Sequence, residues 1–134
     1  MRDRLHLWRT LLPSVHIHYA VKTNPSTSIL DEVYKSGCSF DCASMAEIDK
    51  VLSLGADAKQ IIFANPAKTE RMIKHALKTG VKWFTFDSVE EAEKIHRLHP
   101  DAQLVLRIQV LSSEAFSPMG KKFGVPDDMI EGVL

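Results

Sequence analysis

Short apolar or β-branched runs recur along this chain at intervals of about 22 residues, close to the length of one strand–loop–helix–loop unit. The five runs are Val15–Val21, Ser39–Cys42, Gln60–Ala64, Trp83–Phe86 and Leu104–Ile108. Strands that alternate with helices at this interval predict an α/β fold with a parallel sheet and right-handed crossovers. Two architectures satisfy the pattern: an open doubly wound sheet, or about half of an eight-stranded barrel. Periodicity alone does not choose between them.

The segments between these runs carry apolar residues at helical spacing and recognisable helix ends. Ser44 and Ser88 each precede a glutamate by three residues, which is the spacing of a capping box, and Thr69 precedes the helix between them. Helix ends are expected at the residues that stop helices, namely Gly37, Gly55, Gly80 and Pro100. The helices and the apolar runs therefore alternate regularly.

Composition excludes several classes of protein. The 134 residues suffice for one domain with its own core. Lysine plus arginine equal aspartate plus glutamate at 17 each, so no net charge attracts nucleic acid or an anionic membrane. No apolar run approaches the roughly 18 residues of a membrane span, and the N-terminus has no signal-peptide core. Two cysteines are too few for a disulfide scaffold, so we expect a cytoplasmic protein.

Polar side chains follow each predicted strand, where both architectures bind ligands. These residues are Lys22, Asn24, Asp41, Ser44, Asn65, Lys68, Asp87 and Arg107. The charged side chains among them, two lysines, two aspartates and an arginine, are thus expected on one face. Each of them taken alone is also explained by capping of the next helix, and Asp87 in particular has the position of a helix cap.

Six blocks of sequence, in a consistent order, resemble the ornithine/diaminopimelate/arginine decarboxylase family, whose members use pyridoxal phosphate. They are Tyr19–Asn24, Phe40–Glu47, Phe63–Pro66, Thr85–Ser88, Leu104–Ile108 and Lys121–Gly124. The resemblance runs from about Trp8 to the end of the chain and is greatest to eukaryotic-type ornithine and lysine decarboxylases. Two departures are visible, because Thr23 and Ala67 stand where the family usually has cysteine.

The resemblance implies roles for individual residues. Lys22 is expected to be the catalytic lysine that binds pyridoxal phosphate covalently, which requires an amine that can be neutral and nucleophilic. Asp41 and Arg107 match cofactor-binding residues of the family and are expected to act by position and charge. Glu47 matches a position near the site but is equally explained by a capping box. Lys122 matches a lysine at the family's homodimer interface; an ordinary surface lysine is an equal explanation.

The resemblance also implies a fold and a reaction. Residues 1–134 are expected to form part of a pyridoxal-phosphate-binding barrel domain, a partial (β/α)8 TIM-type barrel of the alanine-racemase-like kind, without the family's C-terminal β domain. The parent enzyme would decarboxylate a basic amino acid, with ornithine the first candidate, giving putrescine for polyamine biosynthesis. We expect this chain alone to bind the cofactor weakly, to turn over no substrate, and to associate or aggregate through its uncovered sheet.

Two other functions compete with this one. A non-catalytic relative that acts by binding a protein, as antizyme inhibitors do, typically loses the cofactor contacts that match Asp41 and Arg107, and both are retained here. An unrelated open α/β binding domain is disfavoured by the ordered blocks. We expect no metal site, because Cys38 and Cys42 lack a second cysteine pair, and the pair His16 and His18 lacks a third ligand.

Overall fold

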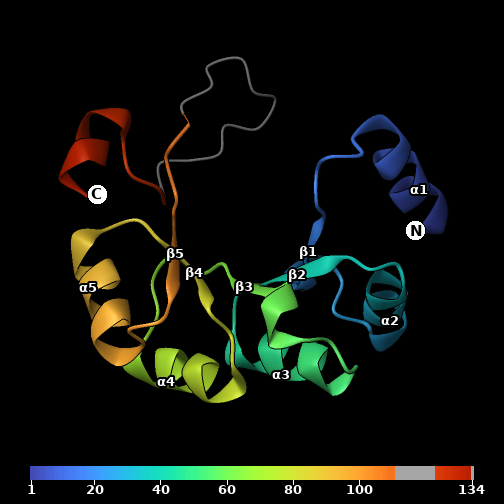
Figure 1. The fold of residues 1–134 in the computed structure, drawn as a ribbon, viewed down its shortest axis with the longest axis horizontal. Helices are drawn as coiled ribbons and strands as arrows, with labels where there is room; N and C mark the ends of the chain where they lie inside the picture. Colours follow the sequence, from blue (N-terminus) through green and yellow to red (C-terminus); the bar gives the residue numbers. More distant parts are fainter. Residues whose placement is uncertain (111–122, 134) are drawn as a thin grey trace.

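Five parallel strands form a single sheet in the computed structural model, which describes residues 1–110 and 123–133 (Figure 1). The strands are β1 (His18–Ala20), β2 (Ser39–Cys42), β3 (Ile61–Phe63), β4 (Trp83–Phe86) and β5 (Gln103–Leu106). Each strand pairs with the next one along the chain, and every pairing is parallel.

Helices connect the strands and lie along one side of them. The α-helices are α1 (Arg2–Leu11), α2 (Thr27–Lys35), α3 (Met45–Ser53), α4 (Glu70–Thr79) and α5 (Val89–Leu98). Short 3₁₀ turns are η1 (Val21–Thr23), η2 (Ala58–Gln60) and η3 (Asp127–Gly132). Figure 1 shows α2 to α5 in an arc around the sheet, whose opposite side they leave open.

The strand order decides between the two predicted architectures. A doubly wound sheet reverses its strand order and carries helices on both faces. Here the order is β1-β2-β3-β4-β5 without reversal, and α2 to α5 cover one side only. This arrangement is that of a section of a β/α barrel. The partial-barrel prediction is therefore confirmed, and the open doubly wound alternative is wrong.

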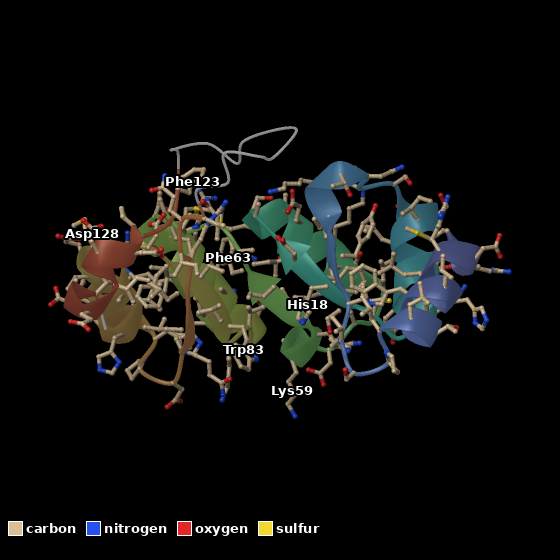
Figure 2. All side chains as sticks on the ribbon, turned by 90° about the horizontal axis from the view of Figure 1, so that it is seen from above. His18, Lys59, Phe63, Trp83, Phe123 and Asp128 are labelled. Atoms are coloured by element: carbon tan, nitrogen blue, oxygen red, sulfur yellow. The ribbon has the colours of Figure 1, made fainter. Side chains whose placement is uncertain are left out.

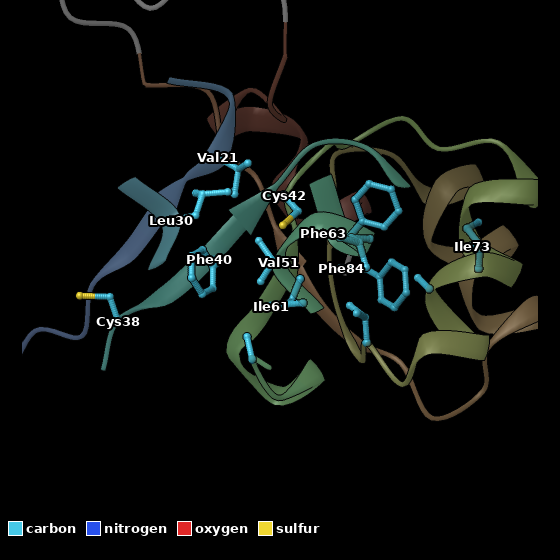
Figure 3. Packing of buried hydrophobic residues seen from close by; sticks show 14 of the residues in the cluster. Val21, Leu30, Cys38, Phe40, Cys42, Val51, Ile61, Phe63, Ile73 and Phe84 are labelled. Atoms are coloured by element: carbon cyan, nitrogen blue, oxygen red, sulfur yellow. The ribbon is translucent and has the colours of Figure 1, made fainter. Parts of the chain in front are cut away.

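The hydrophobic core fills the layer between the strands and the helices (Figure 3). Phe40, Phe63 and Phe84 come from three neighbouring strands and are fully buried. Val51 of α3 and Ile73 of α4 are buried on the helix side of the same cluster. Burial of each such side chain contributes about 1.5–3 kcal/mol before the entropy cost of ordering it. The core thus holds every crossover helix against the strands.

Side chains on the other side of the sheet lie in register across all five strands. Consecutive strand partners connect one residue per strand in a row: Ala20, Asp41, Ile62, Trp83 and Gln103. Because strand side chains alternate between faces, this row points away from the buried phenylalanines. Trp83 remains 42% exposed there. The open face therefore carries both polar and apolar groups, and we refer to it as the concave face.

The predicted element boundaries hold with small differences. α5 lies between Ser88 and Pro100, the residues predicted to start and stop a helix, and Gly37, Gly55 and Gly80 adopt positive φ angles of 68°, 91° and 83° past three helix ends. β1 begins at His18 instead of Val15, because its pairing with β2 begins with His18 opposite Ser39. Among the described residues, no helix is long and apolar enough to cross a membrane.

Candidate functional site

The turn that carries Lys22 is fixed by its neighbours in sequence. It is the 3₁₀ turn η1 at the carboxyl end of β1, and Val21 anchors it in the core with no exposed surface. The Thr23 hydroxyl donates a hydrogen bond of 2.7 Å to the carbonyl of Ala20, and the Tyr19 hydroxyl donates one of 3.3 Å to the carbonyl of Asn24. Threonine at position 23, a departure from the family pattern, therefore supports the turn.

Lys22 itself is exposed, in contrast to the buried Val21 before it. Within the described part of the chain, its amine has no hydrogen-bond or ion-pair partner. A rigid backbone turn thus presents a free primary amine at the rim of the sheet. Such an amine can react with a carbonyl carbon once it is deprotonated.

Asp41 lies on the strand next to Lys22. It pairs with Ala20, two residues before the lysine, and belongs to the concave-face row. Its side chain is partly buried between the neighbouring strands. The two residues predicted for the site at this end of the sheet therefore lie on β2 and on the turn that directly follows the adjacent strand β1.

Arg107 follows β5, three strands away from Asp41. At about 4.8 Å per strand, this separation is about 14 Å along the sheet, so the two side chains do not pair directly. The Arg107 backbone N–H donates to the carbonyl of Phe86 at 2.8 Å, which extends the β4–β5 pairing by one residue. The rim thus carries an amine and a carboxylate at one end and a guanidinium at the other.

The prediction that Asp87 caps a helix is wrong. Ser88 is the N-cap of α5, and its hydroxyl accepts a 3.2 Å hydrogen bond from the backbone N–H of Glu91. The Asp87 carboxylate instead accepts a 2.9 Å hydrogen bond from the backbone N–H of Gly124, a residue 37 positions later. Sequence spacing could not separate these roles, because adjacent aspartate and serine are both good caps.

Lys68 is a second lysine beyond a strand, but it is buried and fully partnered. Its ammonium donates hydrogen bonds of 2.7 Å to the carbonyls of Asn65 and Thr85 and lies 3.1 Å from a carboxylate oxygen of Glu91. Burial lowers the pKa of Lys68, while the hydrogen bond that its ammonium donates to Glu91 opposes this shift. We interpret Lys68 as a structural residue whose hydrogen bonds connect the carboxyl ends of β3 and β4.

Glu47 has the geometry of a capping residue. Its backbone N–H donates to the Ser44 hydroxyl at 3.3 Å, and its carboxylate accepts a 2.6 Å hydrogen bond from the backbone N–H of Ala43. The return bond thus reaches one residue further back than in a standard capping box. The capping explanation is confirmed, while a role near a ligand stays a prediction. Lys122 lies outside the described residues.

The cysteines near the sheet are buried, and the two histidines of the β1 region contact neighbouring side chains. Cys38 and Cys42 are free and buried, and burial raises the pKa of Cys42 to about 12. The Nε2 atom of His16 is hydrogen-bonded to the Ser39 hydroxyl at 2.7 Å. The His16 ring lies edge-on to the His18 ring, with the ring centroids 5.2 Å apart. Burial and the nearby His16 lower the pKa of His18. No group of three potential metal ligands is found among residues 1–110 and 123–133.

The chain matches a family of enzymes whose description names both a cofactor and a reaction. A profile of the family described as pyridoxal-dependent decarboxylase, pyridoxal binding domain, matches residues 1–133. Ornithine decarboxylase of Caenorhabditis elegans is 45% identical over 122 residues, which are 91% of this chain and 29% of the worm protein. Ornithine decarboxylase of Neurospora crassa is 42% identical over 132 residues, which are 98% of this chain and 27% of the fungal protein. The chain spans less than a third of the length of these relatives.

Solved structures agree with the sequence relatives. The arginine decarboxylase of Paramecium bursaria Chlorella virus superposes with a TM-score of 0.93 at 39% identity, covering 98% of this chain and 36% of the viral chain. Lysine decarboxylase from Selenomonas ruminantium superposes with a TM-score of 0.89 at 34% identity, covering 98% of this chain and 35% of the bacterial one. The sheet order and the one-sided helices are thus those of a portion of these larger proteins.

Fold and site together define a section of a β/α barrel with a free lysine amine at the carboxyl rim of its first described strand. Many proteins share this fold, and the family match over residues 1–133 together with the sequence identities shows which family this chain belongs to. The chain belongs to the pyridoxal-dependent decarboxylases, which are lyases, and the match falls on their pyridoxal-binding domain.

Proposed function

We propose that this chain contributes the cofactor lysine and part of the cofactor site of an enzyme that decarboxylates a basic amino acid, with ornithine as the first candidate substrate. The observation that carries the proposal is the exposed, unpartnered amine of Lys22 on a rigid turn beside Asp41. The matching curated proteins are ornithine decarboxylases, and structures of arginine and lysine decarboxylases match as well. These names support a basic amino acid as the substrate class.

The residues present fit pyridoxal phosphate by their chemistry. The Lys22 Nζ would hold the cofactor covalently through its carbonyl carbon. Asp41, on the adjacent strand, would balance positive charge beside Lys22, and the partly buried Arg107 would face negative charge. Bound pyridoxal phosphate would supply the electron sink that lets the substrate carboxylate leave as carbon dioxide.

Residues 1–134 would form part of the pyridoxal-phosphate-binding barrel domain of a longer, two-domain enzyme that works as a homodimer, with Lys122 at the subunit interface. The cytoplasm would be its location, in keeping with two cysteines that are free and not joined by a disulfide. Putrescine would be the product from ornithine.

The proposal is tested by measuring carbon dioxide released from carboxyl-labelled ornithine, lysine and arginine by the full-length gene product with pyridoxal phosphate. We expect turnover of at least one of them, fastest with ornithine. The variant Lys22→Arg keeps the charge but removes the nucleophilic amine, so the rate should fall at least about a hundredfold.

Lys59→Arg is the matched control, because Lys59 is an exposed lysine in η2 at the other end of β3, and it should leave the rate unchanged. A folded protein that releases no carbon dioxide from any of the three substrates would contradict the proposal and favour the non-catalytic, antizyme-inhibitor-like alternative.

A further inference from the structure

The segment Phe123–Val125 lies against the end of β5 and encloses the backbone of Arg107. The Val125 N–H donates to the carbonyl of Arg107 at 2.8 Å, and the Gln109 N–H donates to the carbonyl of Val125 at the same distance. Ile108 and Val125 form a parallel bridge. With the bond from Arg107 to Phe86 on its other side, the Arg107 backbone is held from both directions. Its position is therefore fixed independently of any ligand.

The side chain of Arg107 is held by an aromatic ring. Its guanidinium carbon lies over the ring of Phe123, 5.2 Å from the centroid. Figure 2 shows Phe123 beyond the carboxyl ends of the strands, at the opposite end of the concave face from Trp83. In the described part of the chain, no hydrogen bond or ion pair uses the Arg107 guanidinium. Because a cation–π contact uses none of the N–H groups as conventional donors, they stay available for an anion.

Asp87 and Gly124 anchor this arrangement to β4. The Gly124 N–H donates to the Asp87 carboxylate at 2.9 Å, which joins the residue after β4 to the residue next to Phe123. Gly124 has a φ of 99°, and a Cβ there would lie 2.8 Å from the backbone carbon and oxygen of Ile108. Any other residue would push the segment away from β5. Glycine is thus required for the approach that places Phe123 under Arg107.

We propose that Phe123 is a positioning residue that orients the Arg107 guanidinium toward the anionic part of a ligand at the sheet rim, with Asp87 and Gly124 as its anchor. This inference deepens the proposed function, because it rests on Arg107 facing the bound cofactor. Phe123 acts only through Arg107 and contacts no reacting atom. Loss of the Phe123 ring should therefore weaken ligand binding only when Arg107 is present.

A double-mutant cycle on cofactor affinity tests this dependence. The full-length gene product is prepared as wild type, Phe123→Leu, Arg107→Met and the double variant, and pyridoxal phosphate is titrated into each apoprotein while absorbance is followed. An exposed cation–π contact predicts that Phe123→Leu weakens binding about two- to fivefold. In the Arg107→Met background the same change should have no further effect. Phe123→Tyr keeps the ring and should restore the wild-type affinity.

The outcomes separate the two claims. If Arg107→Met weakens binding and Phe123→Leu does so equally with and without the arginine, Phe123 has a purely structural role and the inference is wrong. If Arg107→Met weakens binding and Phe123→Leu does not, the inference again fails while the proposed function stands. If Arg107→Met leaves the affinity unchanged, both the cofactor role of Arg107 and this inference are overturned.

Discussion

For single residues, burial and hydrogen-bond partners distinguish two lysines that have similar positions in the sequence. Lys22 and Lys68 both follow strands, and either could be assigned to a site by position alone. Lys68 is 3% exposed and is saturated by carbonyls and Glu91, whereas Lys22 is exposed without a described partner. Only the family resemblance distinguished them beforehand, because two of the partners of Lys68, Thr85 and Glu91, come from β4 and α5, beyond the reach of local patterns.

Cys42 should be unreactive in the folded protein. Its pKa of about 12 leaves about one thiol in ten thousand ionised at pH 8, and the side chain has no exposed surface. We therefore expect iodoacetamide at pH 8 to modify Cys42 only after urea is added, as measured by mass spectrometry of the peptide that contains it. Rapid modification without denaturant would mean that the layer between β2 and the helices is open.

The same pKa makes Cys42 a source of alkaline instability. The unfolded thiol ionises from about pH 9, whereas the folded thiol keeps its proton until about pH 12. The stabilising contribution of the protonated thiol is therefore complete below about pH 9 and is lost as the pH rises toward 12.

At the scale of secondary structure, two serines at equivalent helix positions should differ in their effect on stability. Ser88 caps α5 through its hydroxyl, whereas Ser26 is the N-cap of α2 without a side-chain hydrogen bond. We expect Ser88→Ala to lower the free energy of unfolding by about 1 kcal/mol. Ser26→Ala, the matched control, should change it by much less. Urea titrations of both variants give the comparison, and equal losses would contradict the hydrogen-bond assignment.

The elements themselves were largely predictable from local signals. Ser44, Thr69 and Ser88 mark helix starts in the sequence and accept cap hydrogen bonds in the structure. The return bond of Glu47 to Ala43, and the bond from Gly124 to Asp87, were not predictable. Both depend on how a loop enters or leaves the sheet, which spacing along the chain does not encode.

At the scale of the whole molecule, the sequence left the architecture open because strand spacing is the same in both candidates. The deciding fact is that β1 to β5 follow one another without reversal while α2 to α5 share one side. This arrangement brings the carboxyl ends of β1 and β2 together at one end of the rim and places Arg107 at the opposite end. The spacing between them could be obtained only from the strand order and register, and it is too wide for a directly paired triad.

Lys22 is the residue that we propose holds pyridoxal phosphate. The most direct measurement is reduction of the cofactor-loaded, full-length gene product with borohydride, followed by proteolysis and mass spectrometry to locate the phosphopyridoxyl group. We predict the label on the peptide that contains Lys22, and no label at Lys68, whose amine is buried and bonded. A label on another lysine, with the Lys22 peptide unmodified, would contradict the account.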